Sequence, residues 1–582
     1  MKQIYRILDD LSPSEAKLRN IPRKPDGLYN MKLNEYGQLE KRLGYAKYNT
    51  ESLSANKKIL GMHRFYKQNT ATKEFLVAYD TLVVKLAETT PWGATNVKTG
   101  LTTGKETFFT DFYNHCYFVN GTDGVFKYNG TNVRTVGITA PGTPTFNANV
   151  DGSLTEGNYY FKYTFVDEDG YESNGGTVSA VMAAGANPND GIKINIAASG
   201  DAKVTKRRIY RTTVGGASDG IFYYDGEVGD NTTLTYSSTA SDATIRLNTV
   251  LHTDHDAPPS TSHLIAKRLS RLHLADAEKL YLSYLSDRDY FPSDWYIQAG
   301  NMQKISGILE QVNTLPVFTD DSIERLIGTD EDNFEFRNAY STQGCIAYRS
   351  LVNCDNLLVY LGFEGIYYFD GTTAKELNIY LNEYIKDNIN ETYASLSAGC
   401  YFDNKYLLSY PKGASTVPNE TVYYDFKNGT YGIYSFAFGC YSKWDKGGDG
   451  LKLKGGSTTI GRVYSVFSGT NDDTASITAY DSPEAFDLGI PDRLKNFYSI
   501  FVKCKTTTGT GLKVYYQIDD GSETSVDAPE SAVTANKDRW YRFRLPAGVR
   551  GRQLKIRPYI SDAYNATFKG YMIEYDIEEL QS

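Results

Sequence analysis

The stretch Asn114 to Thr131 reads NHCYFVNGTDGVFKYNGT, and it is repeated at Asp355 to Thr372 as DNLLVYLGFEGIYYFDGT. The glycines of the two copies align as Gly121 with Gly362, Gly124 with Gly365, and Gly130 with Gly371. A looser third copy runs through residues 406–408 and 422–430. Because the spacing recurs at distant positions, the chain contains a repeated structural unit.

Each copy has the composition of two short strands, each followed by a turn. Apolar runs such as Tyr117 to Val119 suit strands. Glycine adopts the positive φ that tight turns need, and Asn-Gly or Asp-Gly favours type I′ hairpin turns. The predicted turn residues are Gly121, Gly124, Asn129, Gly130, Gly362, Gly365, Asp370, Gly371, Asn428 and Gly429. Several such units arranged radially bury their apolar faces, so the repeat favours a β-propeller over an ordinary meander in a sandwich.

The composition is that of a globular β protein with many turns. The chain has 582 residues, including 48 Tyr and 51 Gly, a length that predicts several domains. The net charge of −9 argues against a protein that grips nucleic acid by its phosphates, but not against one that lets nucleic acid slide past. The six cysteines form no C-x-x-C pair, so we expect buried free thiols. No apolar run is long enough to span a membrane, and no signal peptide is recognised at the amino terminus.

Changes in residue pattern and proline-containing linkers divide the chain into five segments. Residues 1–45 hold a hairpin, 46–140 the first blades, 141–250 an insert, 258–470 the remaining blades, and 471–582 a terminal sandwich. The predicted fold class is all-β: a β-propeller of about six to eight blades with an inserted immunoglobulin-like or fibronectin III-like sandwich and a C-terminal β-sandwich.

A few elements within these segments are expected individually. Residues 268–274 are predicted to form one strand because apolar and β-forming residues alternate there. Residues 321–326 and 377–384 are the best candidates for short helices.

Three groups of side chains could carry chemistry. The stretch His252 to Asp256, which reads HTDHD, has metal-ligand types at close spacing, but it lies in a linker, and a solvated connection is favoured. The turn Asp167 to Gly170 lacks the further ligands of a calcium loop, so a bare hairpin turn is favoured there. The third group is a basic cluster, interpreted either as an interaction patch or as a solvated sandwich face: Lys206, Arg207, Arg208 and Arg211. Alternation along a strand places Lys206 and Arg208 on one face and Arg207 and Arg211 on the opposite face.

Patterns of known catalytic sites are missing from the sequence. There is no phosphate-cradling glycine loop. His115 adjoins Cys116, but neighbours on a strand point to opposite faces. We therefore predict no catalytic, cofactor-binding or metal-binding residues and no enzyme activity.

The segment Asp26 to Tyr45 reads DGLYNMKLNEYGQLEKRLGY. Together with the propeller repeat, the insert and the terminal sandwich, this hairpin resembles the tail nozzle family of short-tailed bacteriophages, also called tail tubular protein B, to which packaged-DNA stabilisation proteins are related. The resemblance implies a virion protein made in the host bacterial cytoplasm. It also implies a homo-oligomeric ring, a hexamer in that family, below the portal and adaptor, which retains the packaged genome and conducts double-stranded DNA during ejection. Adaptor or head–tail connector proteins and tail fibres would be its partners.

Two other functions are compatible with the sequence. The propeller could bind or degrade a surface glycan, with tyrosines as stacking platforms for sugars. Alternatively, the protein could be another head-closure or tail-tip component. Glycan turnover by the purified protein would separate the first alternative from the structural ones.

Overall fold

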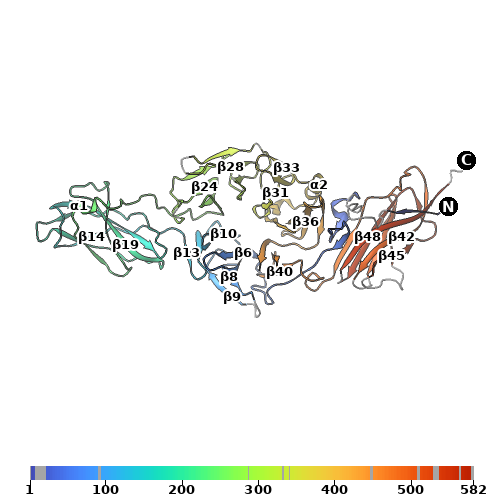
Figure 1. The fold of residues 1–582 in the computed structure, drawn as a ribbon, viewed down its shortest axis with the longest axis horizontal. Helices are drawn as coiled ribbons and strands as arrows, with labels where there is room; N and C mark the ends of the chain where they lie inside the picture. Colours follow the sequence, from blue (N-terminus) through green and yellow to red (C-terminus); the bar gives the residue numbers. More distant parts are fainter. Residues whose placement is uncertain are drawn as a thin grey trace.

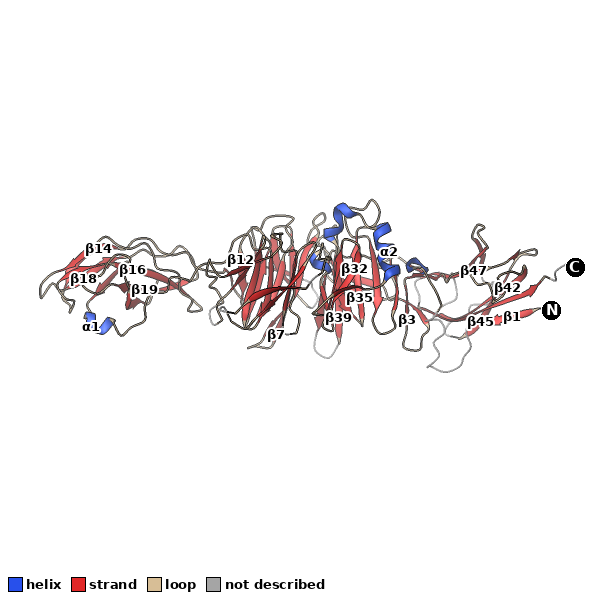
Figure 2. Ribbon diagram, turned by 90° about the horizontal axis from the view of Figure 1, so that it is seen from above, coloured by secondary structure: helices blue, strands red, loops and turns tan. Residues whose placement is uncertain are grey.

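The computed structural model describes residues 2–6, 21–88, 93–285, 288–312, 314–330, 333–339, 341–445, 450–506, 511–527, 537–562 and 565–578. Within these ranges, β-strands make up almost all of the regular structure. Three bodies lie in a row: the insert, a propeller, and a sandwich that holds both ends of the chain (Figure 1). A view from above shows the same linear order (Figure 2). The fold is therefore all-β, a propeller with an inserted sandwich and a C-terminal sandwich, in agreement with the predicted class.

The propeller has seven four-stranded blades in the part of the chain that the structure describes. Blades 1 to 4 comprise β6 (Ile59–Lys67), β7 (Thr72–Tyr79), β8 (Leu82–Leu86) and β9 (Ala94–Lys98); β10 (Phe108–Phe112), β11 (His115–Val119), β12 (Val125–Tyr128) and β13 (Val133–Thr135); β22 (Leu264–Arg268), β23 (Arg271–Asp276), β24 (Lys279–Leu282) and β25 (Tyr296–Gln298); and β26 (Gly307–Ile308), β27 (Leu315–Phe318), β28 (Ile323–Ile327) and β29 (Glu335–Asn338). Blades 5 to 7 comprise β30 (Val352–Cys354), β31 (Leu357–Gly362), β32 (Gly365–Phe369) and β33 (Ala374–Glu376); β34 (Ala398–Phe402), β35 (Lys405–Tyr410), β36 (Glu420–Asp425) and β37 (Thr430–Tyr434); and β38 (Cys440–Asp445), β39 (Leu451–Gly456), β40 (Val463–Val466) and β5 (Tyr45–Lys47).

The blades form a ring because their first strands lie side by side. β6 lies next to β38 on one side and next to β10 on the other, and β10 in turn lies next to β22. The last blade is completed from the other end of the sequence, since β5 pairs antiparallel with β40 and brings Tyr45 opposite Val466. Apolar side chains between the blades provide the core, for example Phe75 and Val77, which are fully buried.

The sequence repeat occupies the two middle strands of its blades. The first copy is β11 and β12, the second is β31 and β32, and the looser third copy is β35 and β36. The copies differ in their turns. Val119 pairs with Val125 across residues 120–124, whereas Gly362 pairs directly with Gly365. The glycines of this first turn therefore share a place in the fold but not one turn geometry.

The insert is built from three small sheets between blades 2 and 3. They are β14 (Thr145–Val150), β18 (Gly191–Asn195) and β21 (Thr235–Ser238); β15 (Gly157–Tyr159) and β17 (Met182–Ala184); and β16 (Phe161–Asp167), β19 (Val204–Arg211) and β20 (Tyr223–Val228). The fully buried rings of Tyr159, Phe161 and Tyr163 pack with isoleucines of β18 and β19 in a core that Tyr290 also joins from outside the insert.

The C-terminal sandwich recruits the beginning of the chain. Its strands are β1 (Gln3–Arg6), β2 (Leu28–Tyr29), β3 (Met31–Leu33), β4 (Leu39–Lys41), β41 (Ile477–Asp481), β42 (Lys495–Thr506), β43 (Leu512–Ile518), β44 (Thr524–Asp527), β45 (Arg539–Arg544), β46 (Arg550–Gly551), β47 (Leu554–Asp562) and β48 (Ala566–Ile577). The predicted hairpin β3–β4 pairs with β48, so the segments 1–45 and 471–582 share one body. The other sheet of the sandwich continues into blade 6, because β2 lies between β37 and β41 in a single nine-stranded sheet.

Two local predictions were wrong. Residues 268–274 form a hairpin rather than one strand, because Leu269 and Ser270 both adopt positive φ and reverse the chain between β22 and β23. Within the expected helix over 321–326, residues 323–326 belong to β28, whose backbone pairs with β27 and β29, so ladder bonds replace the helix.

Helices are few and short in the described ranges. The expected helix over 377–384 forms as α2 (Ile379–Asn388) and begins after Asn378, whose side chain accepts the backbone N–H of Leu381. The others are α1 (Asp242–Ile245) and the 3₁₀ turns Pro25–Gly27, Tyr348–Ser350 and Glu391–Leu396.

Candidate functional site

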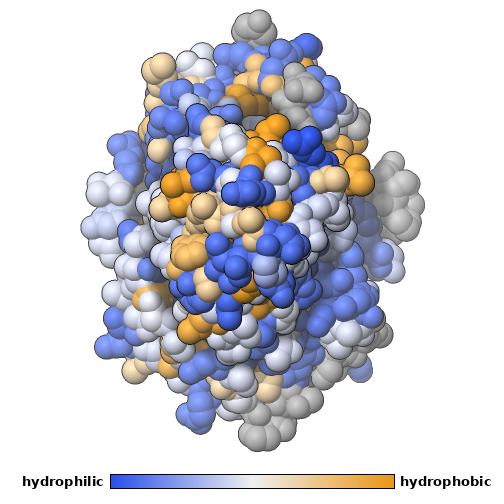
Figure 3. Space-filling model, turned by 90° about the vertical axis from the view of Figure 1, so that its left-hand side faces the viewer, coloured by the Kyte–Doolittle hydropathy of each residue, from blue (hydrophilic) through white to orange (hydrophobic). Residues whose placement is uncertain are grey.

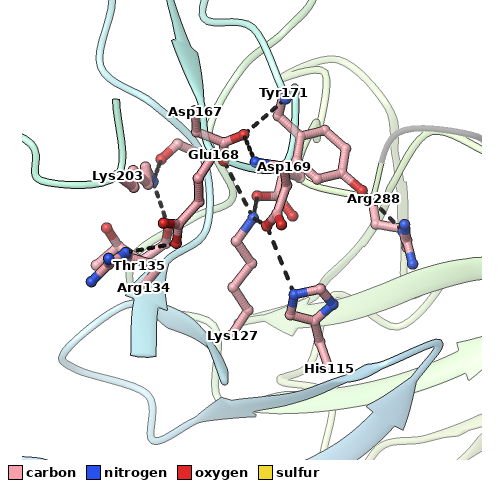
Figure 4. A network of polar contacts seen from close by, with 12 residues as sticks. His115, Lys127, Arg134, Thr135, Asp167, Glu168, Asp169, Tyr171, Lys203 and Arg288 are labelled. Carbon is pink, nitrogen blue, oxygen red and sulfur yellow. Dashed lines mark hydrogen bonds and ion pairs between the residues drawn. The ribbon is translucent and has the colours of Figure 1, made fainter. Parts of the chain in front are cut away.

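A network of charged side chains joins the insert to the propeller (Figure 4). At its centre, Lys127 of β12 reaches from blade 2 towards the insert. Its amine lies 3.3 Å from Asp167, 2.7 Å from Asp169 and 2.7 Å from Asp289. The side chains of Lys127, Asp167 and Asp289 are almost completely buried. One buried cation therefore holds carboxylates from the insert and from blade 3 together.

Strand alternation and a short turn position these groups. Phe126 and Tyr128 point into the core of blades 1 and 2, so Lys127 between them faces the other side. In the turn Asp167 to Gly170, Asp167 accepts the backbone N–H of Asp169 at 3.0 Å and that of Tyr171 at 2.9 Å. This local capping holds the carboxylates in place. The turn that could have served calcium thus presents its acids to a lysine.

Further contacts surround this centre. Lys203 of the insert donates to the backbone oxygens of Thr135 and Gly137. Arg134 pairs with Glu168 at 3.0 Å, and His115 lies 3.7 Å from Asp169. Arg288 of blade 3 donates to the Tyr171 hydroxyl at 3.1 Å. The insert is therefore held by both of the blades between which it emerges.

The shifts in pKa reflect one cation shared by three acids. Burial raises the pKa of Asp289 and of Asp167, against the opposing charge of Lys127. For Asp169, burial is outweighed by the hydrogen bond and charge of Lys127, and its pKa is lowered. Burial also opposes the charged form of Lys127, but Asp289 and Asp167 outweigh it and raise the pKa of the amine. Burial lowers the pKa of His115 to about 4, so this imidazole is neutral at pH 7.

The predicted turn glycines adopt the left-handed conformation with one exception. Gly130 and Gly371 have φ of 95° and 97°, and positive φ is also found at Gly121, Gly124, Gly365 and Gly429. Gly362 has no positive φ and ends β31. The Asn-Gly and Asp-Gly pairs sit in longer loops than the expected two-residue turn, since Tyr128 pairs with Val133.

The loops owe their length to side-chain caps. Asn129 accepts the backbone N–H groups of Thr131 and Asn132, and Asp370 accepts those of Thr372 and Thr373. In the third copy the cap is Asp425, while Asn428 only donates to it. These residues shape blade turns and contact no part of the charged network.

The basic cluster is used inside the insert. Arg207 and Arg211 are fully buried; Arg207 donates to backbone oxygens, and Arg211 pairs with Asp225 and Asp242. Lys206 and Arg208 lie on the opposite face, as alternation predicted, and each pairs with Glu227. Acids and backbone oxygens of the insert itself therefore pair with the basic side chains that suggested an interaction patch.

A second candidate site is a cavity of about 580 Å³ between blades 6 and 7. Lys454 on its wall is 2% exposed and donates to Ser465 at 2.7 Å, and no ion pair joins it to a described carboxylate. Burial, with Lys452 and Arg64 nearby, lowers the pKa of Lys454 to about 7. The Trp444 Nε1–H and the Tyr434 hydroxyl also line the cavity, are buried and have no hydrogen-bond partner among the described residues. This wall suits a ligand rich in oxygen acceptors.

Neither site was recognised in the sequence. Lys127 lies 40 residues from Asp167 in the chain, and the two belong to different bodies. Lys454 lies in β39, whose sequence is that of an ordinary strand. Only the acids of the turn Asp167 to Gly170 had drawn attention, as a candidate for calcium.

Comparisons with known proteins give only distant likenesses. No family model and no curated protein sequence matches the chain. Among solved structures, it is similar to an extracellular domain of BT4673 from B. thetaiotaomicron, with 8% identity and a TM-score of 0.26, over 80% of this chain and 43% of that one. The chain thus spans less than half of that structure.

Two other solved structures are similar at the same low level. An exo-β-1,3-galactanase from Phanerochaete chrysosporium shows 8% identity and a TM-score of 0.18, over 82% of this chain and 98% of that one. The Neurospora crassa Pan2 WD40 domain shows 7% identity and a TM-score of 0.25, over 73% and 95%. These TM-scores are too low to carry a functional argument. No helix among the described residues is long and apolar enough to cross a membrane.

Proposed function

We propose that this protein is a structural subunit of a bacteriophage tail nozzle. The observation that carries the proposal is the arrangement of three β bodies in a row, with the propeller and the C-terminal sandwich sharing one nine-stranded sheet. The propeller and the sandwich of such a subunit are stiffly joined, because bending at that junction would break backbone ladder bonds. Copies of a stiff, elongated subunit packed side by side form a tube.

The opening hairpin supports the same function. Its sequence, Asp26 to Tyr45, resembles the nozzle family, and here the hairpin is built into the sandwich at the end of the row. In the proposed assembly this end faces the adaptor and portal, and the ring is a hexamer as in the family resembled. The genome is retained and then passes through the central channel.

The charge of the chain suits a conduit. A wall rich in Lys and Arg would release counterions and bind the phosphates of DNA tightly, whereas transport needs little net attraction. The net charge of −9 is compatible with weak attraction, and the basic cluster of the insert is paired internally.

The insert is the part proposed to meet other tail components, such as fibres. Figure 3 looks onto that end of the molecule and shows separate hydrophobic areas among hydrophilic ones. Large apolar side chains exposed in the insert are Phe146, Val181, Val214, Ile221, Leu234, Leu247 and Val250.

The test combines imaging and binding. Purified protein, mixed with adaptor rings of the same virus, is expected to assemble into rings with a central channel in electron micrographs. Its affinity for duplex DNA at physiological salt is expected to be weak. Tight, strongly salt-dependent DNA binding by the isolated monomer, with no assembly on the adaptor, would falsify the nozzle proposal.

The cavity between blades 6 and 7 favours glycan binding as a second candidate function. Its unpaired donors, Trp444 Nε1–H and the Tyr434 hydroxyl, together with Lys454, match the oxygen acceptors of an acidic sugar. Glycan-array binding that is lost in Lys454→Met, or turnover of a bacterial surface glycan, would support it. Absence of both, with ring assembly intact, would leave the nozzle as the function.

A further inference from the structure

The linker that returns the chain from the insert to blade 3 gathers three metal-ligand side chains. One ligand atom from each of His252, Asp254 and His255 lies within 4.8 Å of the others. In the sequence, this HTDH stretch reads as a solvated connection, because nothing there shows that the side chains converge. In the structure, they do converge, at the edge of the junction between insert and propeller.

Hydrogen bonds from neighbouring groups orient the metal-ligand side chains. The Nδ1 of His255 lies 3.1 Å from the backbone oxygen of Glu172, so Nδ1–H donates and Nε2 keeps its lone pair. Tyr284 donates its hydroxyl hydrogen to one oxygen of Asp254 and leaves the other oxygen available. Carbonyl and hydroxyl partners of this kind hold and tune the ligands in metal sites.

The ring of His255 is also held by stacking. It is 9% exposed and lies between the ring of Tyr290, at 3.7 Å and 3°, and that of His252, at 4.8 Å and 17°. Its backbone N–H donates to Asn174 of the insert at 2.8 Å. Tyr290 and Asn174 therefore fix His255. His252 is exposed and turns out of its stack on His255 to bind, because the lone pairs of two parallel rings do not meet at one ion.

We propose that His252, Asp254 and His255 bind a divalent transition metal ion, with zinc as the reference ion. Two imidazoles and one carboxylate are borderline donors that suit zinc, whereas calcium and magnesium require more oxygen ligands. Zinc–nitrogen bonds of about 2.0–2.1 Å place the ligand atoms about 3.3 Å apart, a contraction that rotation of His252 provides. A water molecule completes the coordination on the exposed side.

The ion would join the two bodies. Through Glu172 and Asn174 its ligands contact the insert, and through Tyr284 and Tyr290 they contact blade 3. A bound ion fixes the linker at this point and makes the insert part of one rigid unit with the propeller. Metal loading would thus set the orientation of the end of the molecule that is proposed to meet other tail components.

The experiment uses the full chain after chelator treatment and dialysis. Titration with zinc chloride, followed by calorimetry and by elemental analysis after desalting, is expected to give one bound zinc per chain. His252→Ala, which changes an exposed side chain, is expected to weaken binding at least tenfold while leaving the circular dichroism unchanged. Bound zinc is also expected to slow proteolysis within residues 251–262.

A matched control distinguishes this site from the other group of ligand types, His63, Asp111 and Cys116. There His63 already pairs with Asp111 at 2.6 Å, and burial raises the pKa of the Cys116 thiol. His63→Gln should therefore keep one zinc per chain. No zinc bound by the native chain at 100 μM, equal binding by His252→Ala, or loss in His63→Gln instead would each overturn the proposal.

Discussion

The insert and the C-terminal sandwich are joined to the same propeller by different means. The sandwich shares a backbone ladder with blade 6, through β37, β2 and β41. The insert is docked by side chains around Lys127 and by two linkers. A ladder has no titratable group and opens only when strands separate, whereas a side-chain network responds to protons, metal ions and single substitutions. One junction is built to be stiff and the other to be adjustable.

The largest effect is expected at the sandwich junction. Arg42 is fully buried and bonds to Asn30 at 2.7 Å, to both oxygens of Asp472 and to Ser435. Arg42→Met leaves these groups without their cation, so the free energy of unfolding should fall by about 3–5 kcal/mol. Urea denaturation followed by tyrosine fluorescence measures it.

A nearby exposed pair is the control for this variant. Lys47→Met removes an ion pair with Asp473 whose members are 39% and 29% exposed, and it should cost no more than about 1 kcal/mol. Equal losses in the two variants would mean that the ladder alone, and not Arg42, holds the junction.

The next largest effect is expected at the insert junction. Lys127→Met leaves Asp289 and Asp167 buried without a cation, which weakens docking by about 3 kcal/mol. The insert should swing free while the propeller remains folded, seen as a larger radius of gyration in X-ray scattering and faster cleavage of the linkers. Lys206→Met, at an exposed pair within the insert, should change neither quantity. Unfolding of the whole molecule in a single step would show that the two bodies are not separable.

The pH dependence of folding stability further distinguishes the insert junction from the sandwich junction. The pKa of His115 is about 4 in the folded state, below its ordinary value near 6.5, because burial and the nearby cations Lys127, Arg288 and Lys67 outweigh the opposing charge of Asp169. Between these values the unfolded state binds more protons, so stability falls as the pH falls from 6.5 to 4, by up to roughly 3 kcal/mol. His115→Gln should flatten this part of the curve in urea midpoints measured from pH 4 to 7. Parallel curves for the native chain and the variant would exclude His115 as the cause.

The smallest effect lies in the blades and touches neither junction. Gly371 has φ of 97°, and a Cβ there would meet only the flexible end of Gln311, so strain comes from the backbone alone. Gly371→Val should cost about 1–2 kcal/mol, with the insert docked as before. Gly142→Ala, in a linker with open space and no positive φ, should be neutral by thermal denaturation. A loss as large as that of Arg42→Met would mean that the blade turns dominate stability.

The sequence correctly predicted strands and turns that depend on residues close together in the chain. The Gly-containing repeat located the middle strands of blades 2, 5 and 6, because turn glycines and alternating apolar residues act over a few residues. Where two local signals competed, the prediction failed. Residues 268–274 look like one strand because they contain no Gly, Pro, Asn or Asp, yet Leu269 and Ser270 both adopt positive φ.

The sites depend on contacts that no local pattern records. Lys127 gave no signal because its three acids come from two other parts of the chain. Arg207 and Arg211 looked like an open patch, since the carboxylates and carbonyls that cover them follow later in the sequence. Buried polar partners over long separations therefore account for most of what the sequence could not provide.

The pairing of β5 with β40 also dictates how the molecule is made. Tyr45 leaves the ribosome long before its partner Val466, and at about 5–20 residues per second the intervening 420 residues take roughly 20 to 80 s to synthesise. During that time, the strand that completes blade 7 has no neighbour, and the ring is open between its first and last blades. Until the seventh blade is finished, this unpaired strand of a newly made chain can pair with the wrong partner, including another copy of the chain.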